Sequence, residues 1–515
     1  MGGAKGQSYL KNAVILTATG LLLRFAGMFF RIYIAGRLGP EGMGLYQLVF
    51  TLYTLSVNLA TAGISVTATR LVAEELSAGR PGGALGVLRR VLALSLGLGL
   101  AAAGLQALLA YPAAKYWLGD VRAALSLRLL APSLPFMAMA AALRGYFLAR
   151  RRVEPNAYSQ MFEQALRICA VMAILPAALD RGIEQACAAV VLGNTASETL
   201  SCLWMFWFYG RDRRAAFPGQ KPRLPQNAMG RLWAILLPVE GSRCTASALQ
   251  TAENMLVPAC LLPFLGSREQ AVSQYGALKG MAIPVLFFPF SFLSALATLL
   301  MPEITEAHIQ GRARALERLI GRMVHLTGIA SIFAAGLFTL YGPELGQLLY
   351  GSEEVGHYLR VLGPAMPCMY LESMVDGVLK GMGEQMATFR YAMWDSVLRI
   401  AGVILLLPRY GMAGFLAVML FSNCFTCALN CRRMLRAAGM RGHWGAWAVQ
   451  PCAALAAALF LGHTAAVRLA GGRGPLALLL LGSAVAGLVY LLALWPFGLG
   501  EEVKSLLAGR KKTGA

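Results

Sequence analysis

The sequence predicts an all-α polytopic membrane protein with 14 transmembrane helices, arranged as two six-helix lobes related by a pseudo-two-fold axis along the membrane normal and followed by two additional C-terminal helices. Three observations lead to this fold class. Apolar runs long enough to cross a bilayer recur along the chain, basic residues gather in alternate segments between these runs, and the first half of the chain is echoed in the second.

The first observation is the hydrophobicity of the chain. Hydrophobic residues make up 57% of it and charged residues only 14%, and the mean hydropathy is +0.59, far from the balance of soluble domains. A helix needs about 20 apolar residues to cross the hydrocarbon core. The runs of this kind leave no room for a large soluble domain, and they cover approximately residues 10–34, 44–69, 87–111, 124–148, 159–179, 184–209, 231–262, 271–301, 322–341, 358–380, 391–408, 412–431, 444–466 and 475–498.

The second observation is the placement of the basic residues. A net charge of +21 is compatible with nucleic-acid binding as well as with membrane topology, so the positions of the 46 Lys and Arg residues decide between the two. Of these residues, 28 lie in segments on one predicted side of the membrane and 8 in segments on the other. The protein is therefore expected in the plasma or inner membrane of the cell. By the positive-inside rule, both of its termini are expected on the cytoplasmic side. Topology therefore explains the charge, and no nucleic-acid partner is predicted.

The third observation is an internal repeat of about 232 residues. Segment 131–137 is echoed by 363–369, with prolines at the same places, and 163–168 is echoed by 395–400. Because the offset spans six helices, the two halves share one orientation, as in transporters with parallel repeats. We therefore predict an N-terminal six-helix lobe, a cytoplasmic linker, a C-terminal six-helix lobe, and two additional helices with a basic tail, at residues 1–210, 211–230, 231–440 and 441–515.

This arrangement favours a transporter over an enzyme. Two lobes of like orientation enclose a central cleft, and rocking of one lobe against the other opens that cleft to each side in turn. The sequence contains no His-Glu-x-x-His motif and no Gly-x-x-x-x-Gly-Lys-Ser/Thr phosphate loop. Most of its ten cysteines lie in apolar runs, where they are expected to pack as small hydrophobic residues, so neither a metal site nor a resident cofactor is predicted.

Arginines inside apolar runs predict a cationic cleft. An ionisable residue at the centre of a membrane helix costs about 2.5 to 3.5 kcal/mol on insertion scales, so it is expected to face a partner or a wet cavity. Arg24 and Arg31 are seven residues apart, hence on one helix face, and Arg243 lies in the seventh run. Guanidinium groups bind phosphates through paired hydrogen bonds, which points to an anion such as a pyrophosphate. In the alternative interpretation, Arg31 extends to the outer interface beside Arg37.

Four carboxylates are candidates for gating or ion coupling. Glu240 and Glu253 lie in the seventh run, and Glu372 and Asp376 lie in the tenth. An unpaired carboxylate there would bind a proton or Na⁺. The alternatives are structural, because Glu240 is three residues from Arg243 and Asp376 is four residues from Lys380, spacings at which opposite charges neutralise each other.

Two further pairs are predicted to be structural ion pairs. Glu163 with Arg167 and Asp395 with Arg399 are each four residues apart, at equivalent places of the repeat. Glu198 lies alone in an apolar run, and the sequence suggests no role for it.

Several motifs resemble those of a known family. The early segments Arg37-Leu38-Gly39 and Gly42-Met43-Gly44-Leu45-Tyr46, with the predicted helix count, resemble the MOP (multidrug/oligosaccharidyl-lipid/polysaccharide) flippase superfamily. Residues 143–147 and 154–167 are similar to its stage V sporulation protein B and polysaccharide-flippase branch, related to the lipid II flippases. In that family Arg24 matches a cationic position that engages the lipid pyrophosphate. Phe30-Arg31 stands where the family pattern has Arg-Asp.

The resemblance implies a function. It implies alternating-access transport of an undecaprenyl-pyrophosphate-linked sugar, a peptidoglycan precursor or a polysaccharide repeat unit, from the inner to the outer leaflet. The implied partners are this lipid-linked anionic glycan and membrane lipids, with cell-wall synthesis enzymes as further candidates. Coupling to H⁺, Na⁺ or the membrane potential stays open. The alternatives are a MATE-like cation or drug antiporter and, from other classes, a membrane glycosyltransferase or ligase, or a scaffold that transports nothing.

Overall fold

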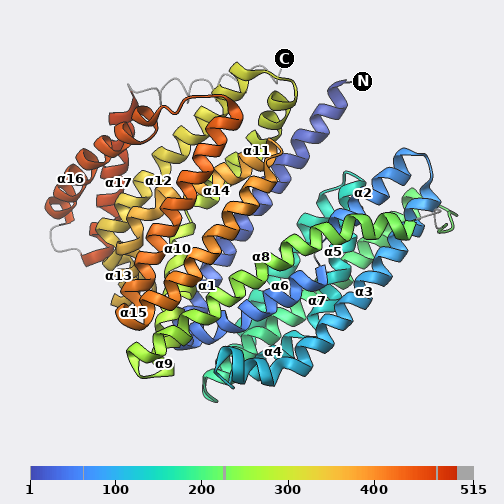
Figure 1. Ribbon diagram of the computed structural model, residues 1–515, viewed down its shortest axis with the longest axis horizontal. Coiled ribbons are helices and arrows are strands. Elements are labelled where there is room, and N and C mark those ends of the chain that lie inside the picture. The colour runs from blue at the N-terminus through green and yellow to red at the C-terminus, as the bar shows by residue number, and fades with distance from the viewer. Residues whose placement is uncertain (1, 62, 224–227, 471–473, 496–515) are drawn as a thin grey trace. The chain divides into compact units, whose positions relative to one another are not determined.

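The computed structural model describes residues 2–61, 63–223, 228–470 and 474–495, and all of the regular structure in these ranges is helical (Figure 1). This confirms the predicted all-α class. The chain divides into two compact units, Met1–Gly276 and Ala277–Ala515, which are described separately below. For residues 2–17, 237–240 and a few others within these ranges, the helix is described but the side chain is not.

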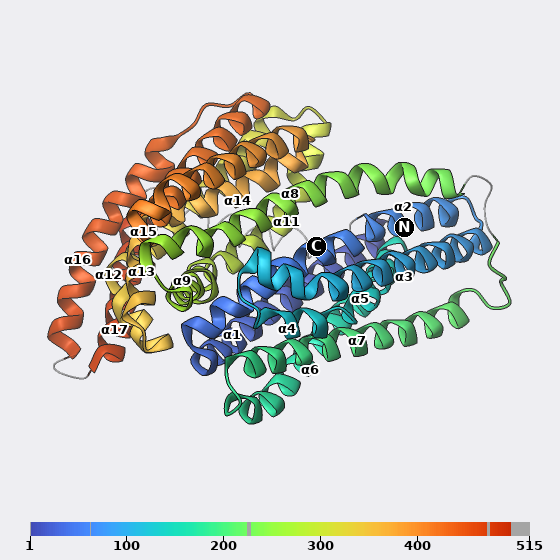
Figure 2. The ribbon, with the colours of Figure 1, turned by 60° about the horizontal axis from the view of Figure 1, so that its bottom comes forward.

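The first unit consists of α1 Gly2–Thr61, α2 Ile64–Ser77, α3 Pro81–Pro112, a π-helical turn Ala113–Leu118, α4 Ala123–Leu130, α5 Ser133–Ala149, α6 Glu154–Leu179, α7 Ile183–Ala216, α8 Ala228–Leu265 and α9 Arg268–Tyr275. Helices α6 and α7 run side by side (Figures 1 and 2). Helix α1 is broken at Gly39, whose φ of 68° and ψ of −179° favour glycine and precede Pro40. A second break at Gly63, φ 73°, divides the run predicted at 44–69 between α1 and α2.

A π-helical segment Gly276–Ala282 begins at the last residue of the first unit and leads into the second. The second unit continues with α10 Ile283–Phe287, α11 Phe290–Ile309, α12 Ala313–Tyr350, α13 Glu353–Leu362, a 3₁₀ turn Gly363–Ala365, α14 Met366–Gly381, α15 Gln385–Ala438, a further π-helical turn Gly445–Val449, α16 Gln450–Ala470 and α17 Gly474–Leu494. Helix α15 has 54 residues and is broken at Gly411. At 1.5 Å per residue it is about 80 Å long, more than twice the hydrocarbon thickness, so its two segments suit two crossings.

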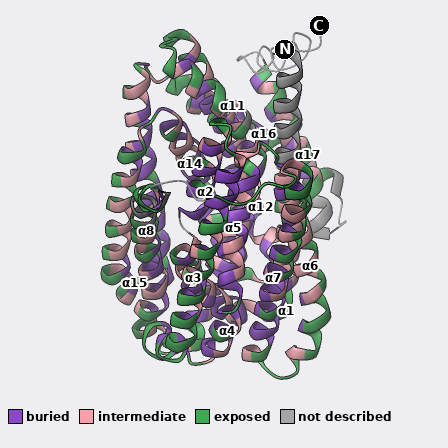
Figure 3. Ribbon diagram, turned by 90° about the vertical axis from the view of Figure 1, so that its right-hand side faces the viewer, coloured by how far each residue is buried: buried purple, intermediate pink, exposed green. Residues whose placement is uncertain are grey.

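Several helices meet the requirements for crossing a membrane. Among the described residues, seven are long and apolar enough, or eight if the bent pair α4 and α5 counts as one span. Exposed residues recur along the outer faces of the helices (Figure 3). Large apolar side chains are among the exposed residues, as expected where lipid replaces water: Leu108, Phe460 and Phe29 are 80%, 70% and 67% exposed. A polytopic membrane protein is therefore supported, and the count of 14 stays a prediction.

The repeat reappears in the ends of the helices. Three helix boundaries of the first unit recur 232 residues later in the second: the end of α2 at Ser77 and of α11 at Ile309, the start of α3 at Pro81 and of α12 at Ala313, and the end of α4 at Leu130 and of α13 at Leu362. The glycines before α3 and α12, Gly79 and Gly311, have left-handed φ values of 70° and 66°. The same turn chemistry therefore ends and starts the same helices in both halves.

Helices α8 and α9 pack against α1 within the first unit. Asn58 of α1 donates a hydrogen bond to Ser247 of α8 at 3.0 Å. Gly44 of α1 approaches α9 so closely that an added Cβ would collide with the carbonyl of Val272. These contacts explain why the first compact unit extends beyond the linker predicted at 211–230. The predicted lobes, residues 1–210 and 231–440, describe the parts expected to move in transport, and their boundaries stay a prediction.

The last two helices, α16 and α17, pack on α12 of the second unit. They run side by side in both views (Figures 1 and 2). The hydroxyl of Tyr490 donates to the carbonyl of Ile329 at 3.0 Å, in a cluster with Ala454, Ala458 and Leu494. The terminal pair is thus attached through apolar contacts and one buried hydrogen bond.

Candidate functional site

Arg31 and Arg167 line one small pocket inside the first unit. The pocket has a volume of about 180 Å³ and is lined by residues of α1 and α6, Tyr46 and Gln164 among them. The two helices come close at Gly27, where an added Cβ would lie 3.9 Å from the amide nitrogen of Gln164. The sequence predicts Arg31 as part of a cationic cleft, and the structure adds Arg167, for which spacing alone predicts only an ion pair.

The charge around this pocket is positive. Arg167 donates to the Glu163 carboxylate at 2.7 Å, and the guanidinium of Arg144 on α5 lies 3.6 Å from the other oxygen of that carboxylate. Glu163 therefore serves two arginines, and Arg31 contributes a third guanidinium. Arg31, Arg167 and the Glu198 carboxylate all act electrostatically on Tyr46, so three guanidinium groups face two carboxylates here. Since guanidinium groups pair with phosphate and carboxylate oxygens, this pocket suits an anion.

The other predicted cleft residues lie elsewhere. Arg24 and Arg243 are exposed on α1 and α8, and neither lines the pocket of Arg31. Glu253 is buried on α8 and acts electrostatically on Tyr275 of α9. The side chain of Glu240 lies outside the described residues, so its predicted pairing with Arg243 stays a prediction.

The second unit holds a group of carboxylates instead. On α14, Asp376 accepts a hydrogen bond from Lys380 at 2.6 Å. This contact agrees with the structural alternative, in which the two opposite charges four residues apart neutralise each other. Glu372, half-buried one turn earlier, lies within electrostatic range of Asp376, Asp395 and Arg399.

Asp395 and Arg399 form the ion pair that their spacing predicts, at 3.4 Å. Both also bind Ser422, which donates to Asp395 and accepts from Arg399 at 2.7 Å, and Thr426 donates to Asp395 at 3.0 Å. Hydroxyl groups of the second segment of α15 therefore hold this pair in place.

A buried polar network in the first unit explains Glu198, to which the sequence assigns no role. Tyr53 of α1 donates to the Glu198 carboxylate at 2.5 Å and lies 2.6 Å from the hydroxyl of Ser133. The amide of Asn194 donates to the other carboxylate oxygen at 2.8 Å. Asn194 is one turn away on the same helix, but Tyr53 and Ser133 come from helices far apart along the chain, so the sequence shows only a carboxylate inside an apolar run.

Charged groups also gather where α1 is broken. Arg122 donates to Asp120 and, at 2.7 Å, to Glu41 just after Pro40. The hydrogen bonds to Asp120 raise the pKa of the Arg122 guanidinium above its usual range, in spite of partial burial. Arg268 at the start of α9 lies against Gly119, and burial lowers the pKa of its guanidinium. Opposite charges thus tie the first turn of α4 to α1.

The long apolar helices and the repeat define the class: a polytopic helical membrane protein with charged residues enclosed within each unit. Comparison with known proteins agrees with this class. A family model described as polysaccharide biosynthesis protein matches residues 9–229, and one described as MatE matches residues 246–405.

Curated relatives cover most of the chain. Stage V sporulation protein B of Bacillus subtilis is 27% identical to it over 79% of the chain and 80% of its own length. The lipid II flippase MurJ of the same organism is 22% identical over 73% of each chain.

Solved structures share the fold. An inward-facing multidrug resistance MATE family transporter of the MOP superfamily aligns with a TM-score of 0.65 and 15% identity, over 84% of this chain and 100% of its own. A MOP superfamily transporter from Pyrococcus furiosus aligns with a TM-score of 0.60 and 14% identity, over 83% and 96%. The chain is thus similar along most of its length to polysaccharide-biosynthesis and flippase proteins, and it shares the fold of solved transporters of the MOP superfamily.

Proposed function

We propose that the protein moves an undecaprenyl-pyrophosphate-linked sugar, a peptidoglycan precursor or a polysaccharide repeat unit, from the inner to the outer leaflet. The observation that carries this proposal is the pocket of Arg31 and Arg167, where positive charge exceeds negative charge. The match to the polysaccharide biosynthesis family and the likeness to stage V sporulation protein B and a lipid II flippase support it.

The chemistry of binding follows from the residues of the pocket. Glu163 holds the Arg167 guanidinium in one orientation, so little side-chain freedom is lost when a phosphate oxygen binds. Arg31 adds a second fork of donors from α1. A pocket of about 180 Å³ takes a diphosphate and not a whole glycan, so the sugar and the lipid chain extend from it. The polyprenyl chain stays in the surrounding lipid throughout the cycle.

Movement then requires that access to the pocket alternates. In the first unit, Gly44 of α1 is in close contact with Val272 of α9 and with Gly276, the residue after α9. The charge distribution places nearby Arg122 and Arg268 outside. We take this contact as the closed outer end, and the breaks at Gly39 and Gly63 as points where the helices bend when it opens. Both termini are cytoplasmic in this proposal.

The driving force stays a choice between the membrane potential and an ion. Outward movement of an anion gains about 2.3 kcal/mol per charge per 100 mV of inside-negative potential, so a diphosphate needs no coupled ion. If an ion is used, Glu240, Glu253, Glu372 and Asp376 are the candidates to bind it.

Flipping of a fluorescent polyprenyl-diphosphate sugar in proteoliposomes tests the proposal. Arg31→Gln and Arg167→Gln each remove charge-assisted hydrogen bonds of about 1.5–3 kcal/mol, so flipping should fall about 10- to 100-fold. Arg89→Gln, at an exposed position of α3, is the matched control and should flip normally. Unchanged flipping by both pocket variants, with normal thermal stability, would remove this pocket from the substrate path.

A second candidate is a cation or drug antiporter of the MATE type. The match of residues 246–405 to the MatE model and the carboxylates around Glu372 favour it. Such a protein should be stabilised against heat by organic cations, whereas the proposed flippase should be stabilised by the lipid-linked diphosphate. A thermal-shift series with both classes of ligand separates the two functions.

A further inference from the structure

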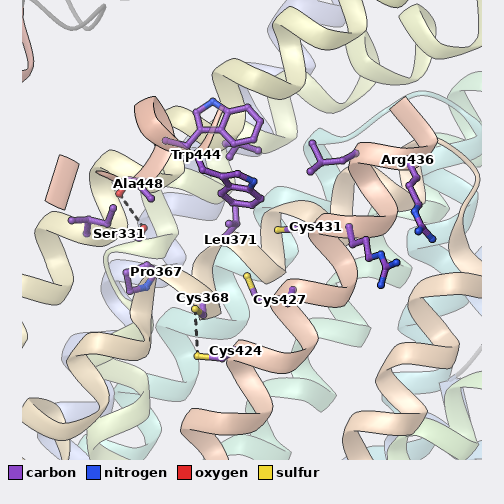
Figure 4. Close-up of a pocket in the computed structure, with 17 residues that line it drawn as sticks. Ser331, Pro367, Cys368, Leu371, Cys424, Cys427, Cys431, Arg436, Trp444 and Ala448 are labelled. Atoms are coloured by element: carbon purple, nitrogen blue, oxygen red, sulfur yellow. Dashed lines mark hydrogen bonds between the residues drawn. The ribbon is translucent and has the colours of Figure 1, made fainter. Parts of the chain in front are cut away.

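An apolar groove lies within the second unit, and two of its lining residues, Cys368 and Cys427, are within electrostatic range of Glu372. Its volume is about 540 Å³, and its walls come from α12, α14, α15 and the π-helical turn before α16. Apolar and thiol side chains cover most of it, among them Leu371, Cys427 and Cys431 (Figure 4). Ile332, Leu435 and Trp447 also line it. A groove of this composition excludes polar solutes and accepts a hydrocarbon chain.

One end of the groove is cationic. Arg432 and Arg436, one turn apart on α15, line it together with the half-exposed Trp444 (Figure 4). Arg433 between them binds Glu384 with two hydrogen bonds at 2.7 Å. Within the described part of the chain, Arg432 and Arg436 have no acidic partner of this kind. The two guanidinium groups are thus available to an anion that comes from outside the protein.

The order of groups along the groove matches an amphiphile in a membrane. The charge distribution places residues 432–441 on the cytoplasmic side, and Arg with Trp at that level is typical of the lipid headgroup region. Basic pockets between membrane helices on that side bind anionic headgroups. A lipid whose phosphate lies at Arg432 and Arg436 would direct its acyl chain between the apolar walls toward Cys424.

All walls of the groove belong to the second unit. This location helps to identify the lipid that occupies it. The proposed substrate site, the pocket of Arg31 and Arg167, lies within the first unit, so an occupant of this groove is a separate ligand. The groove also depends on the terminal helices: Gly328 of α12 touches the carbonyl of Trp447, a contact without a counterpart in the first unit. Its volume suits an acyl chain of ordinary length and is too small for a whole polyprenyl chain.

We propose that this groove binds an anionic phospholipid of the inner leaflet as a resident ligand, with the phosphate at Arg432 and Arg436 and one acyl chain along Leu371, Cys427 and Trp447. The occupant joins the terminal helices to α15 and is distinct from the transported substrate. The proposal holds whether the transported substrate is a lipid-linked sugar or an organic cation.

Native mass spectrometry of the full chain in detergent tests the proposal. Phosphatidylglycerol should bind at least several-fold more tightly than phosphatidylcholine. Arg432→Gln combined with Arg436→Gln should reduce that affinity about 10- to 30-fold, since each basic residue near the surface contributes about 1 kcal/mol. The matched control, Arg314→Gln combined with Arg318→Gln, removes two exposed charges from the same predicted side and should leave binding unchanged.

A second variant tests the apolar part of the site. Ala428→Trp places an indole in the groove at an exposed position of α15, so it should abolish tight binding of phosphatidylglycerol without unfolding the protein. Binding should also protect Cys424 and Cys427 from a lipid-soluble maleimide. Equal affinity for both phospholipids, binding that survives Ala428→Trp, or displacement by a polyprenyl diphosphate at lower concentration than by phosphatidylglycerol would each overturn the proposal.

Discussion

The two units carry equivalent residues in different surroundings. Glu163 and Arg167 of the first unit correspond to Asp395 and Arg399 of the second, 232 residues later, and both pairs are joined by an ion pair. In the first unit the arginine lines a pocket with Arg31, and in the second it is bound by Ser422. The duplicated frame thus preserves a salt bridge while its neighbours decide whether the arginine is available to a ligand.

The overall balance of charge differs in the same way. Around Glu163 one carboxylate faces several guanidinium groups, whereas around Glu372 three carboxylates lie near Arg399 and Lys380. Ser133 of the buried network corresponds to Ala365, which has no hydroxyl to offer. Helix ends and glycines are shared by the two halves because they fix the frame. Interior polar groups diverge because each half needs its own chemistry.

The second half carries four extra residues after Pro367, so Leu143-Arg144-Gly145 aligns with Leu379-Lys380-Gly381, and these two glycines offer the largest expected difference in stability. An added Cβ at Gly145 would lie 2.5 Å from the carbonyl oxygen of Ser65, whereas at Gly381 it would meet the Thr305 hydroxyl at 3.0 Å. Backbone yields less easily than a side chain, so Gly145→Ala should destabilise the protein by about 2–3 kcal/mol and Gly381→Ala by less than about 1 kcal/mol. Thermal unfolding in detergent measures both, and equal losses would contradict the difference in packing.

The buried network of the first unit should give a smaller effect. Tyr53→Phe removes the hydroxyl that joins Glu198 to Ser133 and leaves a buried carboxylate with one donor fewer, for a loss of about 1–3 kcal/mol. Tyr370→Phe in the second unit removes a single hydrogen bond to the carbonyl of Leu286 and should cost about 1 kcal/mol. A Tyr53 variant as stable as the Tyr370 variant would show that the network adds nothing beyond one bond.

The smallest effect is expected where the second unit is made to resemble the first. Ala365→Ser introduces the hydroxyl of Ser133 at its equivalent position, in the turn before α14. Because the second unit has no carboxylate corresponding to Glu198 (its equivalent is Asn430), the change should alter stability by less than about 0.5 kcal/mol. A gain of 1 kcal/mol or more in the same unfolding assay would reveal a polar partner for this position.

Sequence patterns predict much of the fold. Apolar runs, charge placement and the 232-residue offset predict an all-α membrane protein built from two similar halves, because each depends on periodicity along the chain. The offset even recurs in helix ends such as Ser77 and Ile309. Ion pairs between residues four apart could also be predicted, because one helix turn sets the distance between their side chains.

Contacts between helices could not be predicted from such patterns. Spacing brings Arg24 and Arg31 to one helix face, but the structure groups Arg31 with Arg167 of α6 and leaves Arg24 exposed. Tyr53, which donates to Glu198, is 145 residues away along the chain, and Ser133, which binds Tyr53, comes from a third helix. The groove beside Cys427 needs four elements at once. Local order follows from short-range periodicity, which a sequence displays directly. The chemistry of this protein depends on which helix faces meet, and that is decided only when the helices pack.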